Sequence, residues 1–532
     1  MLYSASHNVV LYPTDEPLRY IAAVPEAKRI GDGWIGVPAR LNTLQALRKL
    51  GEEVPSPLEC DGYDWPIKRP WKPLTHQKIT AAFLALHPRC FCLNDMGTMK
   101  TLSALWAADY LMEIERRKGR RLRALIVAPL SILRVVWEEA IFRNFLGRRT
   151  SAIVHGSAEK RRKQLEKDVD FYIINHDGLA VGLPHNRKSP LEGLAKDLHA
   201  RTDIQLAIVD EASVYRDAGT RRHRAARLLL GSREYLWLMT GTPTPNGPVD
   251  AYGLAKLINN ANGESFTSYK NRVMLQVANF KWVPRVGAAA SARALLQPAV
   301  RYAIEDCVDL PPCTVQQREA ELSKEQIDAF RTLKREAVMS MANGAIVHAV
   351  NEAALRTKLI QTVCGAIYDG THASHDLNPA GRIGVLEEII EGTSRKVVVF
   401  APLTNVLNLL YSKLDKHNRA IINGAVKGDE RREIFKRFGN PDDPLRVLLA
   451  DPATISHGVN DLVTADVVVW YGPTDKTEHY LQGNKRIDRP GQTVRTTIVQ
   501  IVASKIEREI FARLENNESL QGVILKLAEE KI

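Results

Sequence analysis

The sequence predicts an α/β protein with two parallel sheets, a helical insertion between them and a small α/β module at the N-terminus. Two stretches, at about 74–256 and 380–504, alternate short β-branched apolar runs with amphipathic helices, which is typical of parallel sheets covered by helices. The apolar runs are continuous rather than alternating in polarity, as expected for strands buried on both faces. A chain of 532 residues is also too long for one compact core, so three or four units are expected.

Each stretch supplies candidate strands. In the first they are CFCLN (90–94), ALIVAP (124–129), DFYIIN (170–175), LAIVDE (206–211) and YLWLMTG (235–241). In the second they are KVVVFAP (396–402), RAIING (419–424), RVLLAD (446–451), DVVVWYG (466–472) and TTIVQIV (496–502). Residues 256–370 favour helix, and DLPPCT (309–314) is expected to be a turn or an extended linker, because its two prolines cannot lie inside a helix.

The domain organisation follows from these runs. The prediction is a small N-terminal module at 1–62, a first lobe at 70–256, a helical insertion and linker at 257–375, a second lobe at 376–506 and a C-terminal helical brace at 507–532.

Composition and charge describe a soluble globular protein that favours a polyanionic partner. Hydrophobic residues make up 45% and charged residues 25% of the chain, and no apolar run approaches the roughly 20 residues needed to cross a bilayer. The N-terminus lacks a secretion signal, so a cytoplasmic location and no membrane partner are expected. The net charge of +12 favours nucleic acid. Six cysteines without a CxxC pair argue against zinc and disulfides.

The segment LNDMGTMKTLSALWAADYL (93–111) combines a strand end, a turn ending in Lys100-Thr101 and a helix. Such a turn binds phosphates, with the lysine on the β- and γ-phosphates and the threonine hydroxyl on Mg²⁺. Alone, a Lys-Thr pair at a helix start is usually an ordinary helix beginning. The run LAIVDE ends in Asp210-Glu211, which suit Mg²⁺ and the attacking water, although acidic pairs at strand ends also cap helices. Together the two motifs predict a nucleotide site.

Further motifs follow in order along the chain. The series is Gln77 in LTHQK, NDMGTMKT, IVAPLSILRVVWEEA (126–140), VDEAS, LMTGTPTPN (238–246), VVVFAPLTNVL (397–407), INGAVKGDERREIFKRF (422–438), ISHGVNDLVTADVVVWY (455–471) and QGNKRIDRPGQ (482–492). From about residue 70 to 515 this series resembles the motifs of the Swi/Snf-type ATPases of helicase superfamily two. The last motif is the most specific, because Gln482, Arg486 and Arg489 followed by Gly491-Gln492 closely resemble the signature of that family.

The resemblance implies two RecA-like lobes and a DNA-dependent ATPase whose cofactors are ATP and Mg²⁺. The residues that it assigns to the nucleotide are Gln77, Asp95, Met96, Gly97, Thr98, Met99, Lys100, Thr101, Gly458 and Gln482. Gln77 would recognise the adenine edge, and Trp71 would either stack nearby or simply pack. Thr101 and Asp210 would hold Mg²⁺.

Three charged residues complete the catalytic set that the resemblance implies. Glu211 would polarise the attacking water. Arg486 and Arg489 would cross the cleft between the lobes to the γ-phosphate, with Arg489 as an arginine finger worth about 10³–10⁵ in rate. Because the finger comes from the other lobe, hydrolysis would require closure of the lobes, which converts chemistry into movement.

The resemblance also implies a track for double-stranded DNA. The residues that it places near the DNA or couples to it are Ser131, His176, Arg221, Arg222, Thr240, Thr242 and Ser456. Basic clusters such as RRKGRRLR (116–123), KRRK (160–163) and RRHRAAR (221–227) would bind phosphates without reading sequence, with a solvated charged surface as the alternative explanation. A strand-separating DNA helicase is the alternative to a translocase on duplex.

The sequence departs from the family at two places. Met99 replaces the glycine that precedes the lysine, and a left-handed backbone there would cost roughly 1–3 kcal/mol. The protein is therefore either a working motor with a tolerated loop or a DNA-binding or interference factor with a weakened ATPase. In the motif ISHGVNDLVTADVVVWY (455–471), Gly458 and Asn460 align with the family, but an extra residue leaves the role of Asp461 open.

Residues 9–51 predict a compact α/β module with the pattern Pro25…Trp34…Pro38. It resembles the small module that precedes the motor in annealing helicases, which rewind or regress forked DNA. That resemblance implies branched DNA as a partner, with Trp34 or Arg40 engaging a junction; the alternative is a structural cap with Trp34 in its core. The compact size favours a monomer of bacterial or phage origin that acts at the nucleoid.

Overall fold

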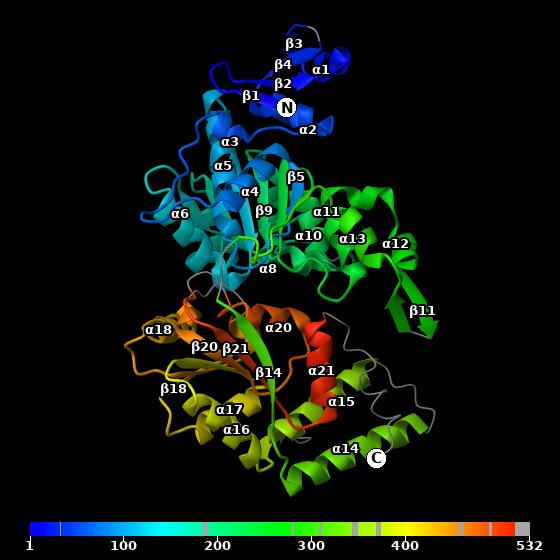
Figure 1. Ribbon diagram of the computed structural model, residues 1–532, viewed down its shortest axis with the longest axis vertical. Coiled ribbons are helices and arrows are strands. Elements are labelled where there is room, and N and C mark those ends of the chain that lie inside the picture. Colours follow the sequence, from blue (N-terminus) through cyan, green and yellow to red (C-terminus); the bar gives the residue numbers. More distant parts are fainter. Residues whose placement is uncertain are drawn as a thin grey trace. The chain divides into compact units, whose positions relative to one another are not determined.

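The computed structural model describes residues 1–31, 33–184, 190–278, 281–307, 311–342, 349–368, 374–455, 461–488 and 492–516. The chain divides into two compact units (Figure 1). The first comprises Met1–Thr244 and Pro248–Cys307, and the second comprises Val308–Ile532 with the short segment Pro245–Gly247. No helix among the described residues is long and apolar enough to cross a membrane.

A seven-stranded parallel sheet in the order β13-β5-β10-β9-β6-β8-β7 is the centre of the first unit. All five strands predicted for this lobe are present, and the short strands β7 and β13 extend the sheet at its edges. The bounds are β5 (Arg89–Cys92), β6 (Arg123–Ala128), β7 (Ser151–Ile153), β8 (Phe171–Asn175), β9 (Ile204–Asp210), β10 (Tyr235–Met239) and β13 (Ala299–Val300).

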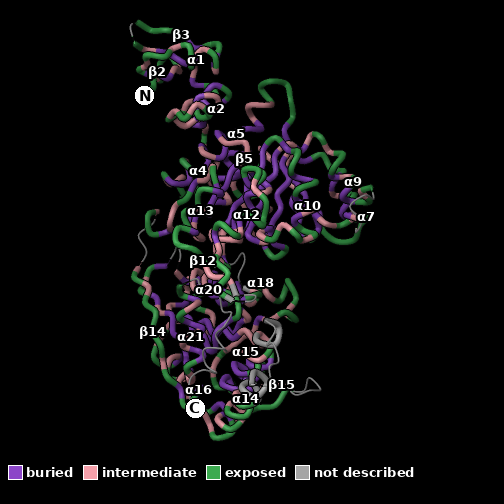
Figure 2. The backbone as a smooth tube through the Cα atoms, turned by 90° about the vertical axis from the view of Figure 1, so that its right-hand side faces the viewer, coloured by how far each residue is buried: buried purple, intermediate pink, exposed green. Residues whose placement is uncertain are grey.

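Both faces of this sheet are buried, which explains the continuous apolar runs. On β6, Leu125 and Val127 belong to one hydrophobic cluster, and Ala124, Ile126 and Ala128 belong to another on the opposite face. The central strands are buried along their length in Figure 2. The covering helices are α4 (Thr75–Leu86), α5 (Lys100–Arg117), α6 (Glu139–Asn144), α7 (Ala158–Leu165), α8 (His176–Leu179), α9 (Gly193–Ala200), α10 (Arg221–Leu230), α11 (Ala251–Ile258), α12 (Phe266–Val273) and α13 (Ala288–Leu295).

The N-terminal module has its own antiparallel sheet, in the order β1-β2-β4-β3, and its own hydrophobic cluster. Its elements are β1 (Leu2–Ser4), β2 (Val9–Pro13), α1 (Pro17–Ala23), β3 (Lys28–Arg29), β4 (Trp34–Pro38), α2 (Leu41–Lys49) and α3 (Pro57–Cys60). The module packs on the first lobe: Gln45 Nε2 donates to the carbonyl oxygen of Ala85 on α4 at 2.8 Å, and Leu58 is buried in the lobe cluster.

The second unit contains a six-stranded parallel sheet in the order β14-β21-β20-β17-β19-β18 around one hydrophobic cluster. The two parallel sheets confirm the predicted fold class of two RecA-like lobes. The strands are β14 (Cys313–Glu319), β17 (Lys396–Phe400), β18 (Arg419–Ile422), β19 (Val447–Ala450), β20 (Ala465–Trp470) and β21 (Thr496–Val502). The helices are α14 (Lys324–Ala342), α15 (Ala349–Cys364), α16 (Ala380–Glu391), α17 (Thr404–Lys413), α18 (Gly428–Gly439), α19 (Pro452–Ile455), α20 (Thr477–Asn484) and α21 (Lys505–Glu515).

The segment expected to be a turn or linker at 309–314 is in part the start of edge strand β14, which pairs in parallel with β21. The residues of β14, CTVQQRE, are mostly polar and exposed, so this strand lacks the apolar run of a central strand. Pro312 lies just before the strand, where its missing N–H costs no ladder hydrogen bond. The region expected to be helical also contains two antiparallel pairs, β11 (Met274–Ala278) with β12 (Lys281–Pro284) and β15 (Ala366–Tyr368) with β16 (Ser374–Asp376).

Candidate functional site

The turn between β5 and α5 has the geometry of a phosphate loop. Helix α5 begins at Lys100. Two residues of the preceding turn have positive φ, Gly97 at 85° and Met99, which directly precedes Lys100, at 56°. Met99 has ψ 36°, so it lies in the left-handed region, which is the condition that made a side chain there costly. Thr98 Oγ1 donates to the carbonyl oxygen of Asp95 at 2.8 Å and tightens the turn. The amides at this helix N-terminus can bind an anion.

Residues of helix α4 form hydrogen bonds with the phosphate loop and with the residue that precedes it. His76 Nε2 lies 3.1 Å from the carbonyl oxygen of Thr98, and Asn94 Nδ2 donates to Thr80 Oγ1 at 2.9 Å. Asn94 Oδ1 in turn accepts the backbone N–H of Tyr302 at 3.0 Å. These contacts position the loop independently of any bound nucleotide. The sequence offered no signal for them, because the partners are distant in the chain.

Gln77 lies in the first turn of α4. Its Oε1 accepts the backbone N–H of Leu74 at 2.9 Å, which leaves the amide Nε2 buried and without a hydrogen-bond partner among the described residues. A buried amide donor without a partner is costly unless a ligand satisfies it. Such a donor is suited to the edge of a base. Trp71, by contrast, is 72% exposed and is not a packed core residue.

The acid pair stands at the carboxyl end of β9. Asp210 Oδ1 accepts the backbone N–H of Glu211 at 3.0 Å, and its Oδ2 accepts the indole N–H of Trp137 at 3.1 Å. Burial, and secondly the charge of Glu211, raise the pKa of Asp210, while the Lys100 ammonium opposes the rise. Glu211 has a left-handed backbone, and its Oε2 is buried without a partner among the described residues. Two carboxylates and a lysine suit a metal–phosphate group.

The turn after β10 joins the acid pair to the phosphate loop. Thr240 is fully buried, its backbone N–H donates to the carbonyl oxygen of Cys92 on β5 at 3.0 Å, and its Oγ1 accepts the N–H of Thr242 at 3.1 Å. A Cβ on Gly241 would lie 3.2 Å from the backbone nitrogen of Met96. The turn and the phosphate loop are therefore in close contact at this position.

Strand order explains why these motifs meet. In the parallel sheet β10 lies between β5 and β9, so the carboxyl ends of the three strands are neighbours. Ligands in open α/β sheets bind at this edge. The sequence-predicted residues that the structure brings together here are Gln77, Asp95, Met96, Gly97, Thr98, Met99, Lys100, Thr101, Asp210, Glu211, Thr240 and Thr242.

The last motif lies in the second unit. Gln482 on α20 is fully buried, its Nε2 donates to Glu478 Oε1 at 3.1 Å, and its Oε1 has no partner among the described residues. Arg486 follows α20 and is 8% exposed. Three predicted residues lie outside the described residues: Arg489, and Gly458 and Ser456 in the segment 456–460.

The predicted DNA residues differ in accessibility. Ser131 is exposed, in the short helix η1 (Leu130–Ile132). His176 is buried, with its Nδ1 3.0 Å from the hydroxyl of Tyr215, so its side chain is directed into the lobe rather than toward a surface track. On α10, Arg221 and Arg222 are both exposed; Arg221 donates to the carbonyl oxygen of Leu183 at 2.7 Å, and Arg222 pairs with Asp177.

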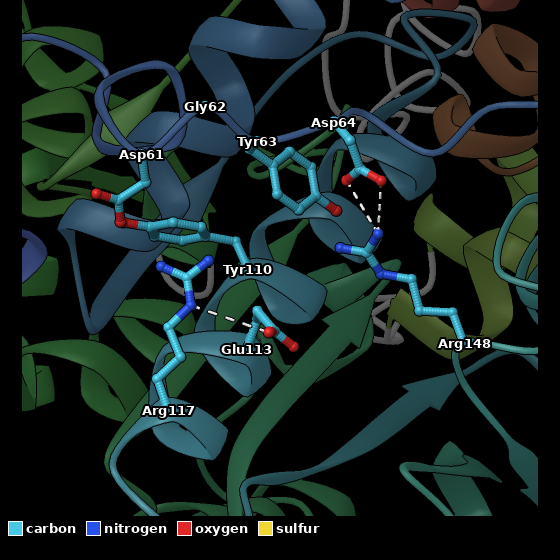
Figure 3. A pocket seen from close by; sticks show the side chains of 8 residues that line it. All are labelled: Asp61, Gly62, Tyr63, Asp64, Tyr110, Glu113, Arg117 and Arg148. Carbon is cyan, nitrogen blue, oxygen red and sulfur yellow. Dashed lines mark hydrogen bonds and ion pairs between the residues drawn. The ribbon is translucent and has the colours of Figure 1, made fainter.

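A polar cavity of about 390 Å³ lies elsewhere on the first unit (Figure 3). The segment Asp61–Asp64 and helix α5 line this cavity. Tyr110 on α5 lies roughly 15 Å from Lys100 along the helix axis, at 1.5 Å per residue. Tyr110 donates to Asp61 at 2.7 Å, and Arg148 pairs with Asp64 at 2.7 Å. These lining groups satisfy one another. We interpret the cavity as a structural junction that holds the N-terminal module on the lobe.

Two RecA-like lobes, a phosphate loop and an acid pair at the carboxyl edge of the first sheet define an ATPase of the helicase superfamily. The chain matches two family models, the SNF2-related domain over residues 76–364 and the helicase conserved C-terminal domain over residues 381–491. The chain therefore belongs to the SNF2-related family, as the motifs predict.

Relatives of this family occur in animals and in viruses. The chain is 23% identical over 473 residues to chromodomain-helicase-DNA-binding protein 9 of Mus musculus, which covers 82% of this chain but only 16% of that protein. It is 23% identical to putative protein p41 of Acyrthosiphon pisum secondary endosymbiont phage 1, over 82% of this chain and 94% of the relative. It is 25% identical to a probable global transactivator of Orgyia pseudotsugata multicapsid polyhedrosis virus, over 79% and 83%.

A solved structure is also similar. It is the Sulfolobus solfataricus SWI2/SNF2 ATPase core in complex with dsDNA, with a TM-score of 0.38, 18% identity, and coverage of 85% of this chain and 92% of that one.

Proposed function

We propose that this protein is an ATP-driven translocase on double-stranded DNA. The observation that carries the proposal is the meeting of the phosphate loop, the acid pair and the Thr240–Thr242 turn at one edge of the first sheet. In this arrangement the turn contacts the loop directly, so hydrolysis and a change at the DNA track can be coupled. The family membership of the chain agrees with this proposal.

The residues present fit ATP and Mg²⁺. The orphaned Nε2 of Gln77 and the orphaned Oε2 of Glu211 are buried polar groups that a ligand would satisfy. Asp210 and Thr101 would hold Mg²⁺, which neutralises phosphate charge when bound. Lys100 would bind the β- and γ-phosphates from the start of α5.

The remaining catalytic roles are carried by charged residues. Glu211 would accept hydrogen bonds from the attacking water and orient it. For Arg486 and Arg489 we retain the role that the resemblance implies, the stabilisation of charge on the γ-phosphate.

DNA is the polyanion that we propose as the track. The net charge of +12 favours a polyanion, and Ser131 and Arg222 are exposed on the first lobe. Several relatives are named chromodomain-helicase-DNA-binding proteins, which agrees with a DNA track. Movement along duplex without strand separation is the mode that we propose.

Forked or branched DNA is the proposed physiological substrate. Within the N-terminal module, Trp34 is half-buried and the side chain of Arg40 is 67% exposed, whereas Ile35 and Val37 form the core of the module. Trp34 is thus not the core residue that a simple cap would require. Trp34 begins β4 and Arg40 follows its end, and an accessible indole and an exposed cation are each suited to contact with DNA.

A second candidate function is a DNA-binding factor with a weakened ATPase. The observation that favours it is the left-handed backbone of Met99, where the family has glycine. A strained loop would lower nucleotide affinity, by about tenfold for each 1.4 kcal/mol.

ATP turnover with duplex, single-stranded and forked DNA, and with RNA, tests the proposal. We expect the highest turnover with duplex or forked DNA. Stimulation by single strands or RNA alone would exclude translocation on duplex. No turnover above background, with DNA binding intact, would favour the second candidate.

The matched control is Glu211→Gln, which keeps the size and buried position of the side chain. Turnover should fall by about 10²–10⁴, the typical contribution of a general base, while nucleotide binding persists. Turnover that survives this substitution would exclude Glu211 as the residue that orients the attacking water.

A further inference from the structure

Trp137 makes a contact that neither the motif analysis nor the proposed mechanism uses. Its side chain is fully buried, and its indole Nε1 donates to Asp210 Oδ2 at 3.1 Å. The other carboxylate oxygen, Oδ1, accepts the backbone N–H of Glu211 at 3.0 Å. Both oxygens of Asp210 therefore accept a hydrogen bond, one from the next residue in the chain and one from a residue 73 positions away.

The position of Trp137 in the chain is unusual. It lies in η2 (Leu133–Glu138), a π-helical turn that follows η1 without a break and precedes α6. π-helical turns are rare and occur frequently at functional sites, because the wider turn redirects a side chain. Ile132 and Leu133, which are both buried in the lobe cluster, fix the start of this turn.

We propose that Trp137 is a positioning residue that fixes the orientation of the Asp210 carboxylate for Mg²⁺. The inference rests on the proposed function, because it assumes that Asp210 binds the metal of the nucleotide complex. An indole N–H is a donor only, so Trp137 cannot itself be a ligand. The hydrogen bond occupies one acceptor site on Oδ2 and leaves the remaining acceptor sites for the cation. It thereby restricts rotation of the carboxylate group.

The physical consequence is a change in metal affinity rather than in fold. Outer hydrogen-bond partners of metal ligands orient those ligands, and their loss typically costs about 10–100-fold in metal affinity. A free Asp210 carboxylate would rotate and would also lose a partner in a buried environment. Trp137→Phe removes the donor and keeps most of the aromatic volume.

The test measures binding of a fluorescent ATP analogue to the full-length protein as Mg²⁺ is titrated, with EDTA as the baseline. We expect Trp137→Phe to raise the Mg²⁺ concentration at half-saturation by about tenfold or more, with nucleotide binding in EDTA unchanged. The matched control is Trp237→Phe. Trp237 is also fully buried in the first lobe, and its Nε1 donates to the carbonyl oxygen of His87 at 3.2 Å, away from the acid pair.

A double-mutant cycle separates positioning from packing. In an Asp210→Asn background, Trp137→Phe should change Mg²⁺-dependent nucleotide binding far less than it does in the natural protein. Equal effects in the two backgrounds, or equal effects of Trp137→Phe and Trp237→Phe, would overturn the inference and leave the proposed function intact. Absence of any Mg²⁺-dependent nucleotide binding in the natural protein would instead overturn the proposed function, and the inference with it.

Discussion

At the scale of single residues, Met99 has a strained backbone and little packing of its side chain. Its backbone is left-handed, with φ 56° and ψ 36°, and its side chain is 41% exposed. The side chain therefore contributes little packing to offset the strain of its Cβ in that region, about 1–2 kcal/mol for an L-residue. The strain is located at the start of α5, directly before Lys100, so relief of the strain acts on the nucleotide site.

Met99→Gly should raise DNA-stimulated ATP turnover by up to about tenfold, since about 1.4 kcal/mol of strain corresponds to that factor. The free energy of unfolding should rise by less than about 1 kcal/mol, because the unfolded chain gains entropy with glycine. Steady-state turnover and urea unfolding measure the two quantities. The control is Met99→Ala, which keeps a Cβ at the same φ. An equal gain with alanine would show that backbone strain is not the cause.

At the scale of elements, the two ends of the first sheet have different tasks. The carboxyl ends of β5, β9 and β10 carry the candidate site, whereas charged clusters tie the amino ends together. Asp203, just before β9, pairs with Arg123 at the start of β6 and with Arg201 at 2.7 Å. Hydrogen bonding from Arg201 first, against the effect of burial, lowers the pKa of Asp203 to about 2.

Asp203→Asn should lower the free energy of unfolding at pH 7 by about 1 kcal/mol, after allowance for solvent screening of a partly exposed pair. Because the pKa is lower in the folded than in the unfolded state, the contribution is present above pH 4. It is lost as the pH falls through about 2. Urea unfolding at pH 7 and at pH 3 measures the trend. The exposed Asp168, which also contacts Arg123, provides the control; Asp168→Asn should have the smaller effect.

Helix α10 allows a sharper test of the DNA track. Arg222 is exposed and pairs with Asp177 at 2.6 Å. The Asp177 carboxylate therefore competes with DNA phosphates for the Arg222 guanidinium, so substitution of either partner should change DNA affinity in the opposite sense. Arg222→Ala should weaken duplex binding and reduce the slope of log K against log salt by about one. Asp177→Asn should strengthen duplex binding, because it releases the guanidinium.

Fluorescence anisotropy over a range of salt concentrations measures both variants. The control is Arg318→Ala on β14, which breaks a similarly exposed pair with Glu388 at 2.7 Å and lies in none of the basic clusters. If the three variants change affinity and slope equally, Arg222 has no specific place on the track.

At the scale of the whole molecule, the net positive charge favours a polyanionic partner, but a local basic cluster need not be the place where that partner binds. The basic cluster at 116–123 is one of those predicted from the sequence to bind DNA phosphates. In the structure, Arg116 pairs with Glu113, and Lys118 and Arg120 pair with Glu115. This cluster therefore fits the alternative explanation of a solvated, internally paired surface. The excess of positive charge over the chain still favours a polyanion.

Removal of the N-terminal module should spare duplex-stimulated ATPase but reduce fork regression or annealing. The deletion should end at residue 54, which keeps the fully buried Leu58 in the cluster of the first lobe; Leu41 of the same cluster is removed with the module, so the free energy of unfolding is measured alongside activity. ATPase and fork-regression assays on the same preparation measure the two activities. Equal loss of both would favour a structural cap.

The point variant Arg40→Ala tests the same prediction without truncation. Its side chain is 67% exposed, so the fold should be retained. We expect a loss confined to forked substrates. Unchanged fork regression in this variant, together with unchanged regression in the deletion, would exclude the module from substrate recognition.

The sequence by itself determined the periodicity, the strand runs and the family. Buried parallel strands need apolar runs, and a phosphate loop needs a turn before a helix, so both are encoded locally and can be read from ALIVAP or from NDMGTMKT. The edge strand β14 could not be predicted, because a half-exposed strand carries polar residues and obtains its hydrogen bonds from β21. Strand β13 could not be predicted for a different reason, because its two residues, Ala299 and Val300, are too few to form a recognisable apolar run.

Only the tertiary structure decided which side chains act together. The buried location of His176, the paired state of Arg221 and Arg222, and the hydrogen bond between Trp137 and Asp210 all depend on partners far away in the chain. The conformation of Met99 also belongs here, since whether a side chain is strained depends on the φ that the turn imposes. Local patterns specify the elements, and packing between distant elements specifies the site.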